Sequence, residues 1–215
     1  MAEFSGLRPG LRALQIWAPD HETLHQTVRI LPGELTDLGT YRLESATSIE
    51  GEVVDEKGQP ISAAIHISEF GERNDWYHWN YWSAKESGTF AVKNLGHKRY
   101  WIWAGTREEE SKSLSPARMV DTRAGSVRGV VLQLSKSTDL LVRFKSAVPW
   151  GSDLLLVSAE GAPVGYSWLR DGNKMRSYAR LSAVPGEYEL QIVLEGKVAR
   201  SQHVSLSGPK VEIDF

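Results

Sequence analysis

Apolar and polar residues alternate with a period of two along most of this chain. In the run 61–67, for example, every second residue is apolar, which places these side chains on one face of a predicted strand. Pro and Gly fall regularly between such runs, and no long window shows the 3.6-residue period of a helix. The pattern predicts an all-β chain of short strands, as in β-sandwiches. Comparable strands are predicted over 49–55, 154–157, 188–192, 204–206 and 211–215.

The chain also contains an internal repeat. Residues 9–16 align without a gap with residues 185–192, and the triplet Ile-Trp-Ala at 16–18 recurs at 102–104. Each copy is followed by a polar stretch, a Gly and a predicted closing strand. The copies lie 86 and 90 residues apart, so the repeat is about 88 residues long and the chain holds about two and a half units. The predicted closing strands cover 33–43, 125–134 and a shorter segment ending at Ile213.

A family resemblance refines this picture. Residues 49–65 (Ile-Glu-Gly-Glu-Val-Val-Asp-Glu-Lys-Gly-Gln-Pro-Ile-Ser-Ala-Ala-Ile) resemble the opening of a carboxypeptidase regulatory-like domain, and residues 88–95 resemble its middle. The resemblance implies a seven-stranded prealbumin-like sandwich, related to transthyretin and to starch-binding folds with a carbohydrate-binding-like architecture. We therefore expect tandem prealbumin-like or Ig-like β-sandwiches. The expected units are a partial, C-terminal half unit over 1–45, a carboxypeptidase regulatory-like unit over 46–136, and a diverged unit over 137–215.

The resemblance also implies a class of function. Such domains are usually tandem modules of secreted or surface-attached bacterial proteins and carry no catalytic residues of their own. We therefore expect a non-catalytic structural or interaction module of a larger, extracytoplasmic protein, with neighbouring domains of the same or another chain as partners. The first six residues have neither the basic nor the apolar region of a signal peptide.

Composition and charge exclude several other classes. The net charge is -2 and is spread evenly, whereas a nucleic-acid binder needs concentrated positive charge. The absence of Cys rules out disulfides, thiolate metal sites and cysteine nucleophiles. The sequence contains no run of 18 apolar residues, so it predicts no membrane-spanning helix. The sequence also contains no G-x-S-x-G, Walker A or G-x-G-x-x-G motif, and we expect no cofactor.

One short motif belongs to zinc hydrolases. The segment His21-Glu22-Thr23-Leu24-His25 spells H-E-x-x-H, which on a helix would place two imidazoles on one face as zinc ligands. Here the following residues alternate like a strand and end at a Pro-Gly turn, and no third His follows until His66. We therefore interpret the motif as part of a strand and its loop, and keep a zinc hydrolase only as the third hypothesis.

The densest positive stretch lies late in the chain, at Arg170, Lys174, Arg176 and Arg180. The last three alternate with apolar or small residues, so they share one face of a predicted strand with Tyr178. Basic strand faces usually serve solubility, and we interpret this one as a solvated outer face. A polyanionic glycan or an acidic neighbouring domain is the alternative partner.

Aromatic residues form the most distinctive cluster. Five of the eight tryptophans fall within residues 76–103. Large aromatic side chains usually fill cores and contacts between domains, and this is the preferred interpretation. The alternative is a carbohydrate-binding module that stacks a saccharide on these rings. The candidate ligand-binding residues are Trp76, Tyr77, Trp79, Tyr81, Trp82, Trp101 and Trp103.

The repeat further predicts which side chains face inward. Tyr100 and Ile102 align with apolar residues in both other copies, so they should face the core of the central unit. Trp101 and Trp103 should then point outward, where a flanking module or a sugar would cover them. The apolar residues of the partial unit lack the opposing sheet of a complete sandwich. We expect them to pack on the central unit or on another chain. This set comprises Leu14, Ile16, Val28, Ile30 and Leu43.

Overall fold

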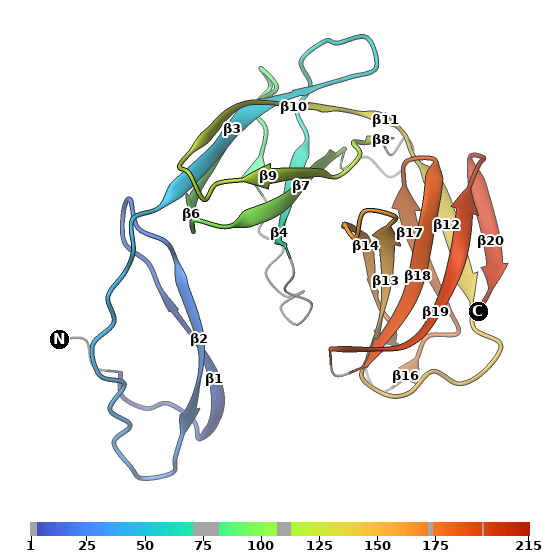
Figure 1. Cartoon of the computed structure of the whole chain (residues 1–215). Coiled ribbons are helices and arrows are strands. Elements are labelled where there is room, and N and C mark those ends of the chain that lie inside the picture. The colour runs from blue at the N-terminus through green and yellow to red at the C-terminus, as the bar shows by residue number, and fades with distance from the viewer. Residues whose placement is uncertain (1–3, 71–81, 107–112, 172–173, 195) are drawn as a thin grey trace.

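The computed structural model of the chain describes residues 4–70, 82–106, 113–171, 174–194 and 196–215. The elements in these residues are all β-strands, which confirms the predicted fold class. They form an N-terminal hairpin, a central sandwich and a C-terminal sandwich (Figure 1). In the described part of the chain, no helix is long and apolar enough to cross a membrane.

The central sandwich consists of two sheets. One sheet has the strand order β10-β3-β6, and the other has the order β11-β8-β7-β4-β5 with β9 also paired to β7. The alternating pattern of the sequence produces this layering, because each strand turns its apolar face toward the opposite sheet. The strands are β3 (Thr47–Val54), β4 (Ala64–Glu69), β5 (Trp82–Ser83), β6 (Thr89–Leu95), β7 (Arg99–Gly105), β8 (Ser113–Leu114), β9 (Arg118–Asp121), β10 (Val127–Gln133) and β11 (Ser135–Lys136).

The C-terminal sandwich also has two sheets, with the orders β17-β12-β20 and β14-β13-β18-β19. A small ribbon, β15 paired with β16, lies outside them. The strands are β12 (Thr138–Arg143), β13 (Ser152–Ser158), β14 (Pro163–Trp168), β15 (Arg170–Asp171), β16 (Lys174–Met175), β17 (Tyr178–Ala183), β18 (Gly186–Leu194), β19 (Lys197–Leu206) and β20 (Lys210–Asp214).

The two sandwiches share one topology. In each, the closing strand runs parallel to the first strand, β10 beside β3 and β20 beside β12, while the other pairings are antiparallel. The order β10-β3-β6 corresponds to β20-β12-β17, and the order β9-β7-β4-β5 corresponds to β19-β18-β13-β14. The C-terminal unit therefore keeps the arrangement of the central one although its opening sequence has diverged.

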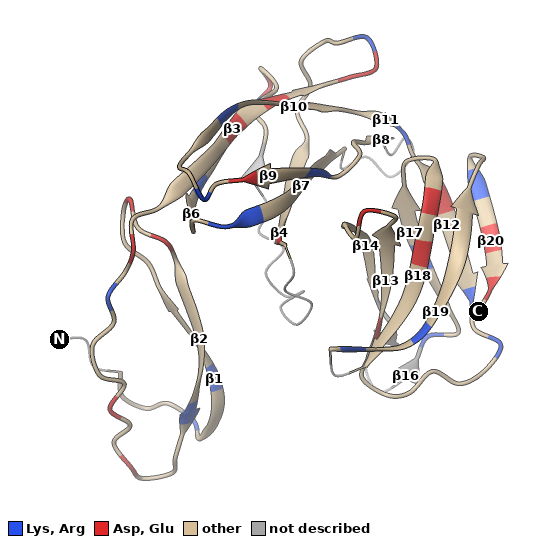
Figure 2. Cartoon of the chain, in the orientation of Figure 1, with Lys and Arg blue, Asp and Glu red and all other residues tan. Residues whose placement is uncertain are grey.

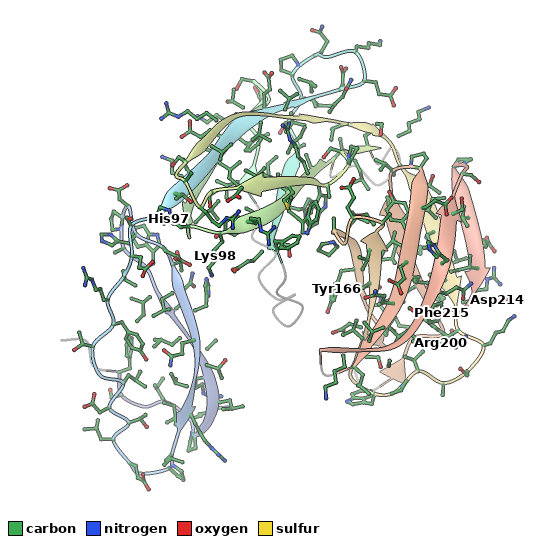
Figure 3. The ribbon with its side chains drawn as sticks, in the orientation of Figure 1. His97, Lys98, Tyr166, Arg200, Asp214 and Phe215 are labelled. Atoms are coloured by element: carbon green, nitrogen blue, oxygen red, sulfur yellow. The ribbon has the colours of Figure 1, made fainter. Side chains whose placement is uncertain are left out.

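Each sandwich has its own apolar core. The central core contains Ile49, Ile65 and Val92 with Tyr100 and Ile102, which confirms the inward orientation predicted for the last two residues. The second core is built around Leu140, Leu154, Leu156, Leu190 and Phe215. The guanidinium of Arg200 lies over the Phe215 ring, with its carbon 4.6 Å from the ring centroid (Figure 3).

Both cores also contain a tyrosine whose hydroxyl bonds to the backbone four residues earlier. Tyr100 donates to the carbonyl of Gly96 at 3.3 Å, and Tyr188 donates to the carbonyl of Val184 at 2.7 Å. The two tyrosines stand at matching ends of matching strand pairs, opposite Glu69 on β4 and opposite Ser158 on β13. They therefore mark equivalent positions, 88 residues apart, in the two units.

The N-terminal region consists of one hairpin, β1 (Gly10–Ile16) and β2 (Leu24–Ile30), followed by a segment that returns to β3 (Figure 1). The closing strand predicted over 33–43 does not form. In both sandwiches the closing strand pairs in parallel with the first strand of its own unit, and no strand forms among residues 4–9. Among the described residues, no strand pairs with the segment 33–43.

The two faces of the hairpin differ in exposure. The face predicted to be apolar is partly covered, with Val28 buried and Leu14, Ile16 and Ile30 half-buried. On the other face Leu11 is 66% exposed, and Trp17, just after β1, is 60% exposed. The hairpin thus keeps the alternation of a sandwich strand pair without the opposing sheet of a complete unit.

Candidate functional site

The central and C-terminal sandwiches meet at a tryptophan joint, which we define as Trp101 and Trp103 of β7 with the C-terminal unit's Ala162. These three residues form an apolar cluster separate from both cores, and the exposed fractions of the two tryptophans are only 5% and 3%. Val164 of β14 packs against the cluster from the C-terminal side. The tryptophans therefore lie outside the central core, as predicted, and Phe70 and Ala117 of their own unit cover them together with Ala162 and Val164 of the neighbouring unit.

Cross-strand neighbours hold both tryptophans in place. The imidazole of His66 stacks on Trp103, with 5.3 Å between ring centroids and planes 9° apart. Phe70 packs against Trp101 with its centroid 5.9 Å away, and the Arg99 guanidinium carbon lies 4.1 Å from the Phe70 ring centroid. This layer orients large, rigid rings toward the C-terminal unit, so the contact forms with little loss of side-chain freedom.

The chain crosses the tryptophan joint almost without a loop. Strand β11 ends at Lys136 and β12 begins at Thr138, so a single residue separates a strand of the central unit from a strand of the next. Figure 1 shows this segment running over the top of the central sandwich into the C-terminal one. A connection this short leaves the two units little freedom to rotate.

The hairpin meets the central sandwich at a second, polar contact. In this ionic joint the Lys98 ammonium lies 2.9 Å from a carboxylate oxygen of Glu69 and 3.5 Å from one of Glu22, which belongs to the hairpin connection. The Thr23 amide donates to the Asn94 carbonyl at 3.4 Å, and the Ser45 hydroxyl lies 3.5 Å from the His97 ring. Figure 3 shows His97 and Lys98 at the end of the sandwich that faces the hairpin.

The close packing of this joint extends to the backbone. A Cβ atom built on Gly96 would lie 2.5 Å from the carboxyl group of Glu22, so the glycine makes room for that carboxylate. Thr122 fixes the same turn, because its hydroxyl bonds to the Gly96 carbonyl at 2.7 Å while its amide donates to the Lys98 carbonyl. The turn before β7 is therefore shaped to receive the hairpin connection.

The charges of the ionic joint shift two pKa values. Burial acts to lower the pKa of Lys98, but the hydrogen bond and charge of Glu69 and the charge of Glu22 outweigh it and raise this pKa overall. Burial, followed by the charge of Glu69, raises the pKa of Tyr100 to about 12. Both groups therefore favour their protonated forms in the folded chain.

The H-E-x-x-H segment does not form the helix that zinc ligation by this motif requires. His21 precedes β2 and makes an isolated bridge with Ser45, whereas His25 lies within β2 opposite Gln15. The His21 ring nitrogen Nδ1 bonds to the Pro19 carbonyl at 2.7 Å, and the Glu22 carboxylate is engaged by Lys98. Its interpretation as strand and loop is confirmed, and among the described residues no three His, Asp or Glu side chains gather as a metal site.

The remaining candidates are placed as follows. Trp76, Tyr77, Trp79 and Tyr81 lie outside the described residues, and the backbone of Trp82 pairs with Ile65 in the two-residue strand β5. In the basic stretch, Arg176, Tyr178 and Arg180 are exposed, while Ala179 and Leu181 enter the C-terminal core. The solvated outer face predicted for this strand is confirmed for these residues.

Sequence reasoning predicted that a flanking unit would cover the tryptophans, but it identified neither Ala162 nor the ionic joint. Glu22 was considered only as part of a motif, and Lys98 and Glu69 stand far from it in sequence. Ala162 gives no signal as a residue type, because its role follows from its place at the turn between β13 and β14. Only the predicted outward orientation of the two tryptophans indicated that a partner would cover them.

Neither a protein-family model nor the sequence of a curated protein matches the chain. Among solved structures, the chain is similar to the Bacillus anthracis TIE protein, with 12% identity, a TM-score of 0.30, and coverage of 96% of this chain and 40% of that one. It is similar to a streptococcal ancillary pilin, with 11% identity, a TM-score of 0.32, and coverage of 97% of this chain and 76% of that one. It is also similar to the shaft pilin SpaA of Lactobacillus rhamnosus GG, with 8% identity, a TM-score of 0.32, and coverage of 79% of this chain and 97% of that one. At these values the likeness does not bear on function.

Proposed function

We propose that this chain is a non-catalytic structural module, a rigid spacer of stacked sandwich units in a larger extracytoplasmic bacterial protein. The observation that carries the proposal is the buried apolar cluster in which Trp101 and Trp103 meet Ala162 and Val164 of the neighbouring unit. Large aromatic rings that point away from their own core and contact the next unit stabilise the relative placement of two units. The one-residue connection between β11 and β12 also limits movement of the two units relative to each other.

The resemblance of residues 49–65 and 88–95 to carboxypeptidase regulatory-like domains supports the same proposal. Domains of that family serve as tandem modules, and the proposed unit boundaries are those expected from the repeat: 1–45, 46–136 and 137–215. In this proposal the neighbouring units are the module's partners, and its surroundings are extracytoplasmic because modules of this family occur in secreted and surface-attached proteins.

Saccharide binding is the weaker alternative for the tryptophans of β7. A sugar ring stacks on an accessible aromatic face, whereas these two residues are almost completely covered by protein. Tryptophan fluorescence titrated with soluble polysaccharides tests this alternative. A saturable change in tryptophan fluorescence, in a chain whose two sandwiches remain packed together, would favour saccharide binding.

Calorimetric unfolding of the full chain tests the spacer. If the tryptophan joint couples the two sandwiches, they unfold in one transition whose calorimetric and van't Hoff enthalpies agree. The double variant Trp101→Ala, Trp103→Ala should separate this into two transitions. Two independent transitions in the unmodified chain would contradict the proposal.

A further inference from the structure

A cleft opens beside the tryptophan joint, between the two sandwiches. Its empty volume, including the part open to solvent, is about 720 Å³. Trp103 contributes from β7 and residues 115–117 from the link before β9. Residues 158–160 contribute from the end of β13 and the turn after it, and residues 183–184 and 186–188 from the end of β17, the turn after it and the start of β18. Because both units supply its walls, this joint cleft exists only when they are packed together.

The charge of the joint cleft is one-sided. Among the described residues that line it, Glu160 and Glu187 are the only charged ones; both are exposed, and none of these lining residues is Lys, Arg or His. Neither carboxylate forms an ion pair in the described part of the chain; Glu187 accepts a hydrogen bond from the Ser205 hydroxyl at 2.6 Å. Arg118 follows the link but lines a different groove, beside β10. Figure 2 shows acidic positions on the turn between β13 and β14 and along β18.

The inner wall of the cleft is partly apolar, and two of its hydroxyl groups already donate to backbone carbonyls. Trp103, Val164 and Tyr188 contribute apolar surface. The Tyr188 hydroxyl donates to the Val184 carbonyl, and the Ser115 hydroxyl donates to the Pro116 carbonyl at 3.2 Å. A neutral sugar needs donors and acceptors around its hydroxyls, whereas a cation with an apolar stem needs only the carboxylates and the apolar wall.

We propose that the joint cleft binds a basic side chain, an alkylguanidinium such as arginine, presented by a partner polypeptide. The methylene stem would lie on the apolar wall while the guanidinium meets Glu160 and Glu187 at the mouth. A ligand held by both units would also stabilise their packed arrangement by mass action. The site requires the tryptophan joint to be formed, and in this respect it rests on the proposed function.

A pair of peptides that differ only in charge tests the site. The full chain is titrated with acetyl-Gly-Arg-Gly-amide and with the same peptide containing citrulline, and binding is followed by Trp fluorescence and calorimetry. We expect saturable binding of the arginine peptide, weaker by about tenfold or more for citrulline and for the variant Glu160→Gln, Glu187→Gln. Glu86→Gln, at an exposed turn of the central unit, is the matched control and should bind as the parent does.

Three results would overturn this site: no saturable binding at millimolar peptide, equal affinity for both peptides, or an unchanged affinity in the double glutamate variant. Tight binding of a neutral oligosaccharide in the cleft would also overturn it. Unfolding of the ligand-free chain separates the two proposals. A single coupled transition with no peptide binding removes the cleft proposal alone, whereas two independent transitions remove the joint on which it depends.

Discussion

The two joints of this chain connect similar elements by different physics. The tryptophan joint is apolar, with buried rings on one side and small residues on the other. The ionic joint relies on one lysine between two carboxylates, with 41% of the lysine side chain exposed. Hydrophobic contact depends little on salt, whereas exposed ion pairs are screened and contribute little stability. The comparison predicts a firm connection between the sandwiches and a weaker, condition-dependent one to the hairpin.

The hairpin itself carries a natural control for this comparison. By the repeat, Trp17 stands where Trp103 stands in the central unit, yet Trp17 is 60% exposed and Trp103 is 3% exposed. The same residue type at the same place in the repeat is therefore covered in one unit and open in the other. What differs is the presence of a packed neighbour, so the tryptophan is a feature of the contact and not a requirement of the strand.

Removing a joint tryptophan should have the largest effect. Trp103→Ala deletes a buried ring and leaves a cavity, and such truncations cost about 3–5 kcal/mol of unfolding free energy. Trp17→Ala, the matched control, should change it by less than about 0.5 kcal/mol. Urea unfolding in low and high salt measures both variants, and the loss at Trp103 should be the same in each salt. Equal, small effects of the two substitutions would erase the distinction between the joints.

Alkaline pH should have the second-largest effect on the free energy of unfolding, through Tyr100, a core residue close to the ionic joint. Tyr100 has a folded-state pKa of about 12 against an unfolded value of 10.0, so its contribution is complete below pH 10 and is lost between pH 10 and 12. The raised pKa of Lys98 acts with the same sign. The pKa shift of Tyr100 corresponds to at most about 3 kcal/mol of unfolding free energy. Tyr100→Phe should therefore flatten the fall in unfolding free energy above pH 10, and an unchanged pH profile would show that the phenol is not responsible.

A smaller effect is expected from crowding the ionic joint. Gly96→Ala places a methyl group where the Glu22 carboxylate lies, so that carboxylate must shift, which disturbs its contact with Lys98. We expect a loss of about 1 kcal/mol and faster amide exchange in β2. Gly208→Ala, where an added Cβ meets nothing within 4 Å, is the control. Protection of β2 that matches the control would show that the Glu22 contact does not hold the hairpin.

The smallest effect is expected for the lysine alone. Lys98→Met keeps an unbranched stem one atom shorter and removes the charge. The ion pairs that are lost are partly exposed, so the free energy of unfolding should fall by less than about 1 kcal/mol. The loss should shrink further as salt is added, because screening already weakens the pairs in the parent. Hydrogen exchange of the hairpin at two salt concentrations measures it. A salt-independent loss would mean that Lys98 acts through packing rather than charge.

Strand alternation made the facing of β7 predictable from the sequence. The sequence alignment paired Ile102 with Ile192, whereas the tyrosine hydroxyl bonds pair Tyr100 with Tyr188 and shift the register by two residues. A shift of two preserves the side of the sheet, so the inward residues remained correct although the partners changed. The all-β class and the repeat were predictable for the same reason, since both are expressed in local periodicity.

Contacts between distant residues were not predictable in this way. The segment 33–43 has the composition of a closing strand, but a strand also needs a partner, and the sequence pattern does not show whether one is present. The position of Ala162 over the tryptophans and that of Lys98 between Glu22 and Glu69 depend on how whole units pack. Periodicity reports which face is apolar, and it does not report what covers that face.

The distance between spin labels on the two sandwiches reports whether the tryptophan joint fixes their relative placement. The chain has no cysteine, so Glu86→Cys and Lys197→Cys place single labels on exposed positions of the two sandwiches. We predict one narrow distance distribution that broadens when Trp101→Ala and Trp103→Ala are added. A distribution that is already broad in the labelled parent, or one that stays narrow without the tryptophans, would contradict the account.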